Sequence, residues 1–164
     1  MTIELQFAGG RGVLGRTITW FGHGSYVHVD SILPERDPNG KLQFLGARFK
    51  GGVLIRPEGY KKFHSILRVS LPCDETISNK YYEFLHQQLG KPYDYKAAFG
   101  GFIFNSNWRN PDKWFCSELV AAGLEYCYYF KYQLFADANK IDPTALLLVL
   151  SSTADIPAPR LRKM

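Results

Sequence analysis

The chain has 164 residues, a length that one compact domain can use to bury a core without disulfides or metals. Hydrophobic residues make up 46% and charged residues 21%, which is ordinary globular composition and argues against disorder. The net charge of +5 permits contact with an anionic surface, but the basic residues are scattered apart from a tail at about 155–164. We therefore expect a single domain over 1–164 and no nucleic-acid partner.

The first half of the chain consists of short segments rich in strand-forming residues and separated by Gly or Pro. Pro34 and the segment 37–40 supply the chemistry of a turn. This spacing favours an antiparallel meander. The predicted strands lie at 2–7, 26–33, 42–47, 52–56 and 65–71, with a short amphipathic helix at 13–21.

The second half changes to helical patterns. A helix is predicted over 74–89, where Gly90 stops it, and another from near Cys116 to about Tyr126. A last short helix begins at Asp142, because the following proline suits the first helical position. The aromatic segment 96–114 is predicted to be a long loop that forms a cleft wall or a cover over the core. Strands early and helices late predict an α+β fold.

The cysteines and the N-terminus indicate the compartment. Three cysteines, Cys73, Cys116 and Cys127, form no CxxC pair or Cys/His cluster, so neither a disulfide framework nor a metal or other cofactor is expected. The first residues lack the features of a secretory signal, and no apolar stretch is long enough to span a bilayer. We expect a cytoplasmic protein with reduced thiols.

Cys116 lies where a loop meets the first turn of a predicted helix. The unpaired N–H groups and the dipole of such a helix stabilise an anion, so a thiolate forms there at lower pH. The same N–H groups can hold a developing oxyanion. A free cysteine also packs well in a core, and the residue types alone leave both readings open.

A cysteine nucleophile needs a base, most often histidine. His28 lies within a predicted strand, which can hold its ring rigidly. His23 lies in a glycine-flanked loop, whereas His64 and His86 fit structural positions better. His28 is therefore the candidate base.

Two segments in this order resemble the cysteine half of the NlpC-type cell-wall peptidases. They are the turn Gly90-Lys91-Pro92-Tyr93 and the helix start Phe115-Cys116-Ser117-Glu118. In the common members the histidine strand follows the cysteine helix, but here no histidine follows Cys116. The order resembles the circularly permuted branch, which includes the lecithin retinol acyltransferase-like enzymes. The strand around His28, the segment 44–53 and the final helix start at 141–146 are similar to that branch as well.

The resemblance implies a permuted papain-like fold and a role for each matching residue. Cys116 would be the nucleophile at the helix N-terminus and His28 its base. The first helical N–H groups, including that of Ser117, would hold the oxyanion with the Tyr93 hydroxyl.

The resemblance also implies a third polar residue, placed on the strand after the histidine, that orients the ring. The matching stretch 42–47 offers Gln43, which we predict for this role. Arg48 lies just beyond this stretch, and Asp30 lies two residues from His28 on the same strand face. None of the three is a clean match.

Three functions follow from this reading. The first is a thiol hydrolase that cleaves a peptide or amide bond in bacterial peptidoglycan, delivered by a phage particle, a secretion device or lysis. The second is an acyltransferase or lipid-acting thiol esterase, for which the basic charge would suit peripheral contact with an anionic surface. The third is a binding module without activity. The oligomeric state is not predicted.

Overall fold

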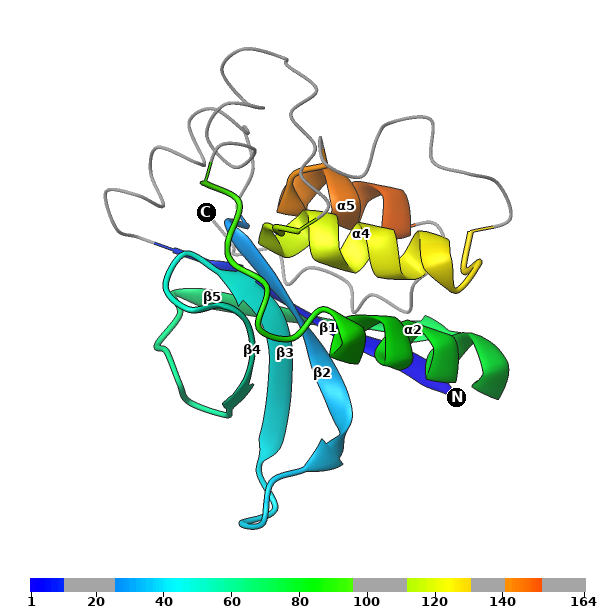
Figure 1. The fold of residues 1–164 in the computed structure, drawn as a ribbon, viewed down its shortest axis with the longest axis horizontal. Coiled ribbons are helices and arrows are strands. Elements are labelled where there is room, and N and C mark those ends of the chain that lie inside the picture. Colours follow the sequence, from blue (N-terminus) through cyan, green and yellow to red (C-terminus); the bar gives the residue numbers. More distant parts are fainter. Residues whose placement is uncertain (11–25, 96–111, 131–140, 152–164) are drawn as a thin grey trace, which may run out of the picture.

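The computed structural model describes residues 1–10, 26–95, 112–130 and 141–151. The predicted helix at 13–21, residues 96–111 of the predicted aromatic loop and the basic tail lie outside these residues. The described elements are β1 (Thr2–Gly9), β2 (His28–Arg36), β3 (Leu42–Arg48), β4 (Gly52–Pro57), β5 (Ser65–Pro72), α2 (Glu75–Gln87), α4 (Cys116–Tyr126) and α5 (Pro143–Leu150). The fold is α+β, as the sequence predicts (Figure 1).

The five strands form one antiparallel sheet in the order β4-β3-β2-β1-β5. Strands β2, β3 and β4 are a meander, but β5 pairs with β1 and not with β4. The prediction of a simple meander is wrong for β5, because β1 pairs with β2 along one edge and offers its second edge to β5. The connection 58–64 therefore links the two edge strands of the sheet.

Strand β2 is longer than predicted. It runs through Pro34 to Arg36, where a turn was expected. The register between β2 and β3 shifts between Ile32 and Arg36. A proline lacks the N–H that a regular ladder needs, and such an irregularity tolerates it.

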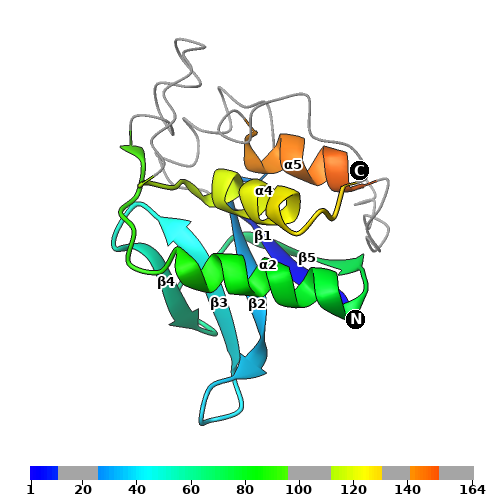
Figure 2. The same ribbon diagram turned by 45° about the vertical axis from the view of Figure 1, so that its right-hand side comes forward.

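Helices α2 and α5 begin at aspartate caps. The Asp74 side chain accepts a hydrogen bond from the Ile77 N–H at 2.8 Å. The Asp142 side chain accepts from the N–H groups of Thr144 and Ala145 at the start of α5. Figures 1 and 2 show all three helices on one side of the sheet. None of the helices in the described ranges is long and apolar enough to cross a membrane.

The core lies between the helices and one face of the sheet, and alternate strand residues supply it. Its fully buried members include Ile3, Leu5 and Phe7 of β1, Val29 of β2, Leu45 of β3, and Leu119 and Leu124 of α4. Because the strand period is two, the residues between these face the other side of the sheet. His28 and Asp30 belong to that second set.

Candidate active site

His28 is the first residue of β2, at the end of the strand where α4 begins (Figure 1). On this strand Val29 and Leu33 face the core, and Ser31 bonds Tyr81 of α2 at 2.6 Å. The alternation turns His28 and Asp30 together to the opposite face. The strand thus places a histidine and a carboxylate side by side.

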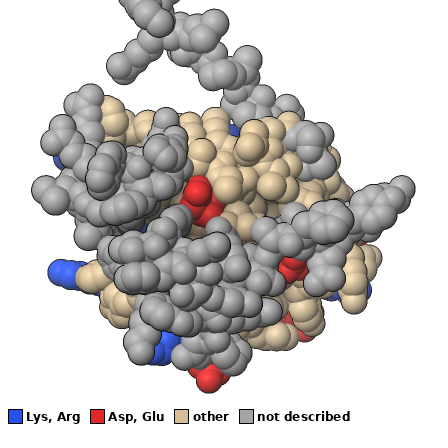
Figure 3. Space-filling model, turned by 90° about the horizontal axis from the view of Figure 1, so that it is seen from above, with Lys and Arg blue, Asp and Glu red and all other residues tan. Residues whose placement is uncertain are grey.

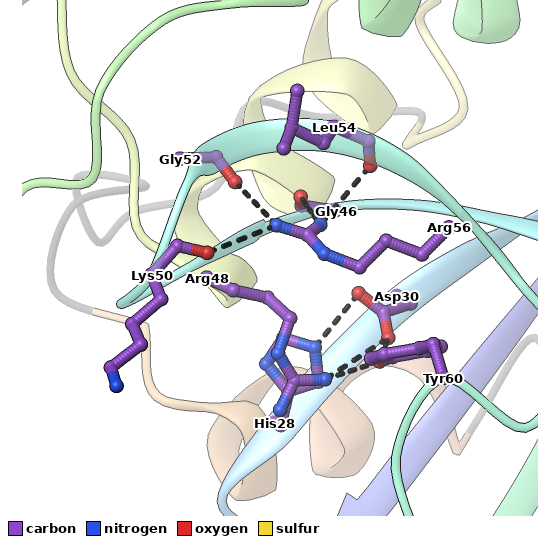
Figure 4. A network of polar contacts seen from close by, with 9 residues as sticks. All are labelled: His28, Asp30, Gly46, Arg48, Lys50, Gly52, Leu54, Arg56 and Tyr60. Atoms are coloured by element: carbon purple, nitrogen blue, oxygen red, sulfur yellow. Dashed lines mark hydrogen bonds and ion pairs between the residues drawn. The ribbon is translucent and has the colours of Figure 1, made fainter.

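The His28 ring and the Asp30 carboxylate form a buried pair (Figure 4). The Nε2 atom of His28 lies 2.8 Å from Asp30 Oδ1, and the two residues are only 7% and 1% exposed. The other carboxylate oxygen, Oδ2, accepts a hydrogen bond from the Tyr60 hydroxyl. The Arg48 guanidinium lies 3.9 Å from the same oxygen. Since Nε2 is engaged by Asp30, Nδ1 is the ring nitrogen left for another partner.

The space for Asp30 comes from a glycine on the neighbouring strand. Ser31 pairs with Leu45, which sets Asp30 opposite Gly46. A Cβ atom at Gly46 would lie 2.0 Å from Asp30 Oδ1, a separation that no real contact allows. The missing side chain is therefore what lets this carboxylate lie against β3 and reach His28.

Cys116 is the first residue of α4 and is only 6% exposed. The His28 side chain lies near enough to this thiol to lower its pKa. The first N–H groups of the helix have no acceptor within the helix, as at every helix start. The nucleophile candidate and the base candidate are thus brought together across 88 residues of sequence.

The charges in this group favour a thiolate and an imidazolium. Burial opposes ionisation of the Cys116 thiol, but the positive charge and hydrogen bond of His28 lower its pKa. Burial likewise disfavours the charged form of His28, but Asp30 and the Cys116 thiolate raise the pKa of His28 to about 9. The pKa of Asp30 is lowered by His28 despite burial. A group of alternating charges results, in which each member stabilises its neighbour.

The other two cysteines behave in the opposite way. Burial raises the pKa of Cys127 to about 11, and it also raises the pKa of Cys73. For both cysteines burial is the largest influence on the pKa. The contrast makes Cys116 the chemically distinct thiol of this chain.

Tyr93 reaches the site on a turn that is held at both ends. Val53 of β4 donates its N–H to the Lys91 carbonyl at 2.9 Å, and Asp94 donates to the Trp114 carbonyl at 3.0 Å. Burial and the Cys116 charge both raise the pKa of the Tyr93 phenol, which therefore stays protonated at neutral pH and can donate a hydrogen bond.

Ser117, the other residue predicted for the oxyanion, follows Cys116 in the first turn of α4. Its side chain is fully buried, and its hydroxyl has no hydrogen-bond partner within the part of the chain that the structure describes. A contribution of its backbone N–H to an oxyanion site stays a prediction.

Gln43 does not take the place predicted for it. It lies opposite Pro57 in the β3–β4 ladder, three residues from Gly46 and so on the other face of β3. Asp30 makes the contact with the histidine instead, from the same strand. The physical reason is the register, which sets Gly46, and not a polar side chain, beside the ring-orienting position.

The residues that sequence reasoning missed are Tyr60 and Phe63 of the 58–64 connection. The Tyr60 hydroxyl bonds Asp30, and the Phe63 ring lies nearly parallel to the His28 ring, with centroids 6.3 Å apart. No local signal identifies them, because their position depends on the order of the strands. The period of two along β2 indicates that Asp30 lies beside His28, but it does not indicate which residues contact Asp30 from outside that strand.

The described surface shows neither a metal cluster nor a basic patch over the helices. Within the described ranges, no group of three or more His, Cys, Asp or Glu side chains could hold a metal ion. Figure 3 shows the Lys and Arg side chains of the described residues lying apart from one another on this face.

Comparison with known proteins gives a likeness of fold. No family model matches the chain, and neither does any curated protein sequence. Among solved structures, the chain is similar to the metalloprotein YiiX from Escherichia coli O157:H7 (DUF1105), with a TM-score of 0.63 and 17% sequence identity over 96% of each chain. At this level of identity the two proteins share the α+β fold, which is all that the likeness establishes.

Proposed function

We propose that this protein is a cysteine hydrolase that cleaves a peptide or amide bond. Cys116 would be the nucleophile, His28 the general base and acid, and Asp30 the residue that orients the ring. The observation that carries this proposal is the buried contact of 2.8 Å between His28 Nε2 and Asp30 Oδ1, together with a Cys116 thiol near enough to His28 for its pKa to be lowered. Nucleophile, base and orienting acid in this arrangement are the recurring set of covalent acyl transfer.

The chemistry follows from the protonation states. The Cys116 thiolate attacks the carbonyl carbon and forms a C–S bond, and the carbonyl electron pair moves to oxygen. The first N–H groups of α4 and the Tyr93 hydroxyl stabilise this oxyanion. His28 then protonates the leaving nitrogen, the C–N bond breaks, and a thioester remains. Water, deprotonated by His28, attacks the thioester and releases the acid and the free thiol.

The substrate class rests on the resemblance to the permuted NlpC-type branch of the papain-like enzymes. In this chain the histidine strand precedes the cysteine helix, and the turn with Tyr93 leads to Cys116, as that branch requires. A peptide or amide bond of bacterial peptidoglycan is therefore the proposed substrate. The thioester is also the intermediate of an acyltransferase, so the assay has to include an acceptor other than water.

The description of YiiX as a metalloprotein adds one control to this assay. The steps above use only side chains and backbone groups of this chain. Hydrolysis of muropeptides is measured by mass spectrometry with and without a chelator, and with an added alcohol or amine acceptor. Activity that survives chelation fits the proposed mechanism, whereas transfer to the acceptor in preference to water would identify an acyltransferase.

The first experiment measures the pH dependence of alkylation by iodoacetamide at each cysteine. In the wild type we expect Cys116 to react well below the ordinary thiol range, at a pH where Cys73 and Cys127 are protonated and inert. In His28→Ala no imidazolium opposes the effect of burial, which raises the pKa of Cys116. Alkylation of Cys116 should therefore shift to alkaline pH. If Cys116 titrates with the other two cysteines in the wild type, the catalytic reading fails and a binding module remains.

A further inference from the structure

The carboxylate of Asp30 is held from the side opposite to His28. Its Oδ1 accepts from the His28 ring, while Oδ2 accepts from the Tyr60 hydroxyl. Arg48 donates from Nη1 to the same hydroxyl. Figure 4 shows the resulting chain of contacts, which runs from the guanidinium through the phenol and the carboxylate to the imidazole.

We propose that Tyr60 and Arg48 are positioning residues that clamp Asp30 and thereby hold the His28 ring in place for Cys116. This inference rests on the proposed function, because positioning the His28 ring matters only if His28 acts as the base for Cys116. The contacts of both residues lead to the Asp30 carboxylate, so the proposed role is exerted through Asp30.

The topology explains how Tyr60 comes to this place. The 58–64 connection joins the two edge strands, β4 and β5, and has to pass across a face of the sheet. The helices cover one face, so the connection passes over the other, where Asp30 lies. The Tyr60 ring packs against Phe44 of β3 with centroids 6.1 Å apart, which anchors the crossing to the sheet.

Aromatic rings surround the Arg48 guanidinium and the His28 ring. The Arg48 guanidinium lies 4.9 Å from the centroid of the Tyr60 ring and 5.3 Å from that of Phe63. The Phe63 ring in turn lies at 13° to the His28 ring. Arg48 is thus packed between the crossing segment and the catalytic pair, with its side chain only 15% exposed.

The charges around Asp30 come from several elements. They are His28 on its own strand, Arg48 on β3, Arg56 on β4 and the Tyr60 phenol on the connection. Arg56 is bound to backbone carbonyls and donates to that of Gly46 at 3.0 Å. Only Tyr60 hydrogen-bonds to Oδ2 within the described residues, so its loss leaves that buried oxygen without a donor.

The test compares two substitutions of the same kind. Tyr60→Phe removes the hydroxyl on Asp30 and keeps the ring contacts with Phe44 and Arg48. Tyr81→Phe removes a buried hydroxyl that bonds Ser31, the residue after Asp30, on the helix-covered face of β2. The readout is the pH at half-maximal alkylation of Cys116, together with the melting temperature.

We expect Tyr60→Phe to raise this pH by about one unit, which is about a tenfold loss of thiolate at pH values below both midpoints. Tyr81→Phe should lower the melting temperature and leave the Cys116 titration unchanged. Arg48→Met should act in the same direction as Tyr60→Phe, and Arg48→Lys should retain part of the wild-type behaviour because it keeps the charge.

A wild-type titration in Tyr60→Phe, while His28→Ala abolishes the low-pH reactivity, would overturn the clamp and leave the proposed function standing. Equal shifts in Tyr60→Phe and Tyr81→Phe would also overturn it, since a general loosening of β2 would then be the cause. A wild-type Cys116 that titrates like Cys73 would instead remove the proposed function and the clamp with it.

Discussion

The Asp30 carboxylate occupies the space that a side chain at Gly46 would fill. A Cβ atom at Gly46 would lie 2.0 Å from Asp30 Oδ1, and this oxygen is the one 2.8 Å from His28 Nε2. The pairing of β2 and β3 therefore couples the identity of one glycine to the orientation of the candidate base. It also makes the glycine a means of testing the site without altering any polar group.

Gly46→Ala is expected to displace Asp30 from His28 and to raise the pH at which Cys116 is alkylated. We expect hydrolysis to fall by about tenfold or more, because an unoriented imidazole transfers protons poorly. Circular dichroism and the melting temperature verify that the sheet is retained. An alanine variant with unchanged kinetics would show that Asp30 does not act through this contact.

Asp30→Asn and Gln43→Ala together decide the identity of the third residue. Removing the Asp30 charge takes away the largest contribution that raises the pKa of His28 against burial, so the imidazolium is weakened and turnover should fall by about 100-fold. Gln43 lies on the other face of β3 and its substitution should leave turnover within about twofold of the wild type. Steady-state kinetics on both variants measure this, and the reverse ranking would restore Gln43 as the orienting residue.

The pH profile of hydrolysis should have its alkaline limit near pH 9. The pKa of His28 is raised to about 9, so the imidazolium that protonates the leaving group is present below that pH and is lost above it. The acid limb lies below the ordinary thiol range, because the pKa of Cys116 is lowered and the thiolate is lost only as the pH falls through that lowered value. A profile that rises continuously through pH 9 would contradict the assignment of His28.

Tyr93→Phe tests the phenol as an oxyanion donor. The raised pKa of Tyr93 keeps its proton in place, and removal of one such donor commonly costs about 10²–10³ in turnover. We expect kcat to fall with little change in KM, because the contact would form only as charge develops on the oxygen. A change confined to KM would assign Tyr93 to substrate binding instead.

Gly52→Ala should loosen the turn that carries Tyr93. Gly52 has φ +67°, and a Cβ atom there would lie 2.2 Å from the Lys91 carbonyl oxygen, which accepts from Val53. We expect a loss of about 1–3 kcal/mol of unfolding free energy and reduced turnover.

Gly40→Ala is the matched control for this variant, with φ +75° and nothing within 4 Å of the added Cβ. It should cost only the backbone strain and leave turnover unchanged. If the two variants are equally active and equally stable, the Lys91 contact has no role in holding the turn.

The sequence by itself determined the features that depend on neighbouring residues. Strand-forming residues between Gly and Pro predicted the five strands, and the helices predicted over 74–89 and from Asp142 correspond to α2 and α5, because such signals are set within a few positions along the chain. The start of a helix at Cys116 and the strand placement of His28 were also predictable in this way. These local signals were enough for the α+β class and for naming Cys116 and His28 as candidates, while the resemblance to the permuted NlpC-type branch selected them as a pair.

Only the tertiary structure decided which side chains complete the site. The register of β2 against β3 set Gly46 beside Asp30 and turned Gln43 to the other face. The pairing of β5 with β1 carried Tyr60 across the sheet to the carboxylate. Register and strand order depend on pairing energies summed over many residues that are distant in sequence, and no short segment of this chain contains them.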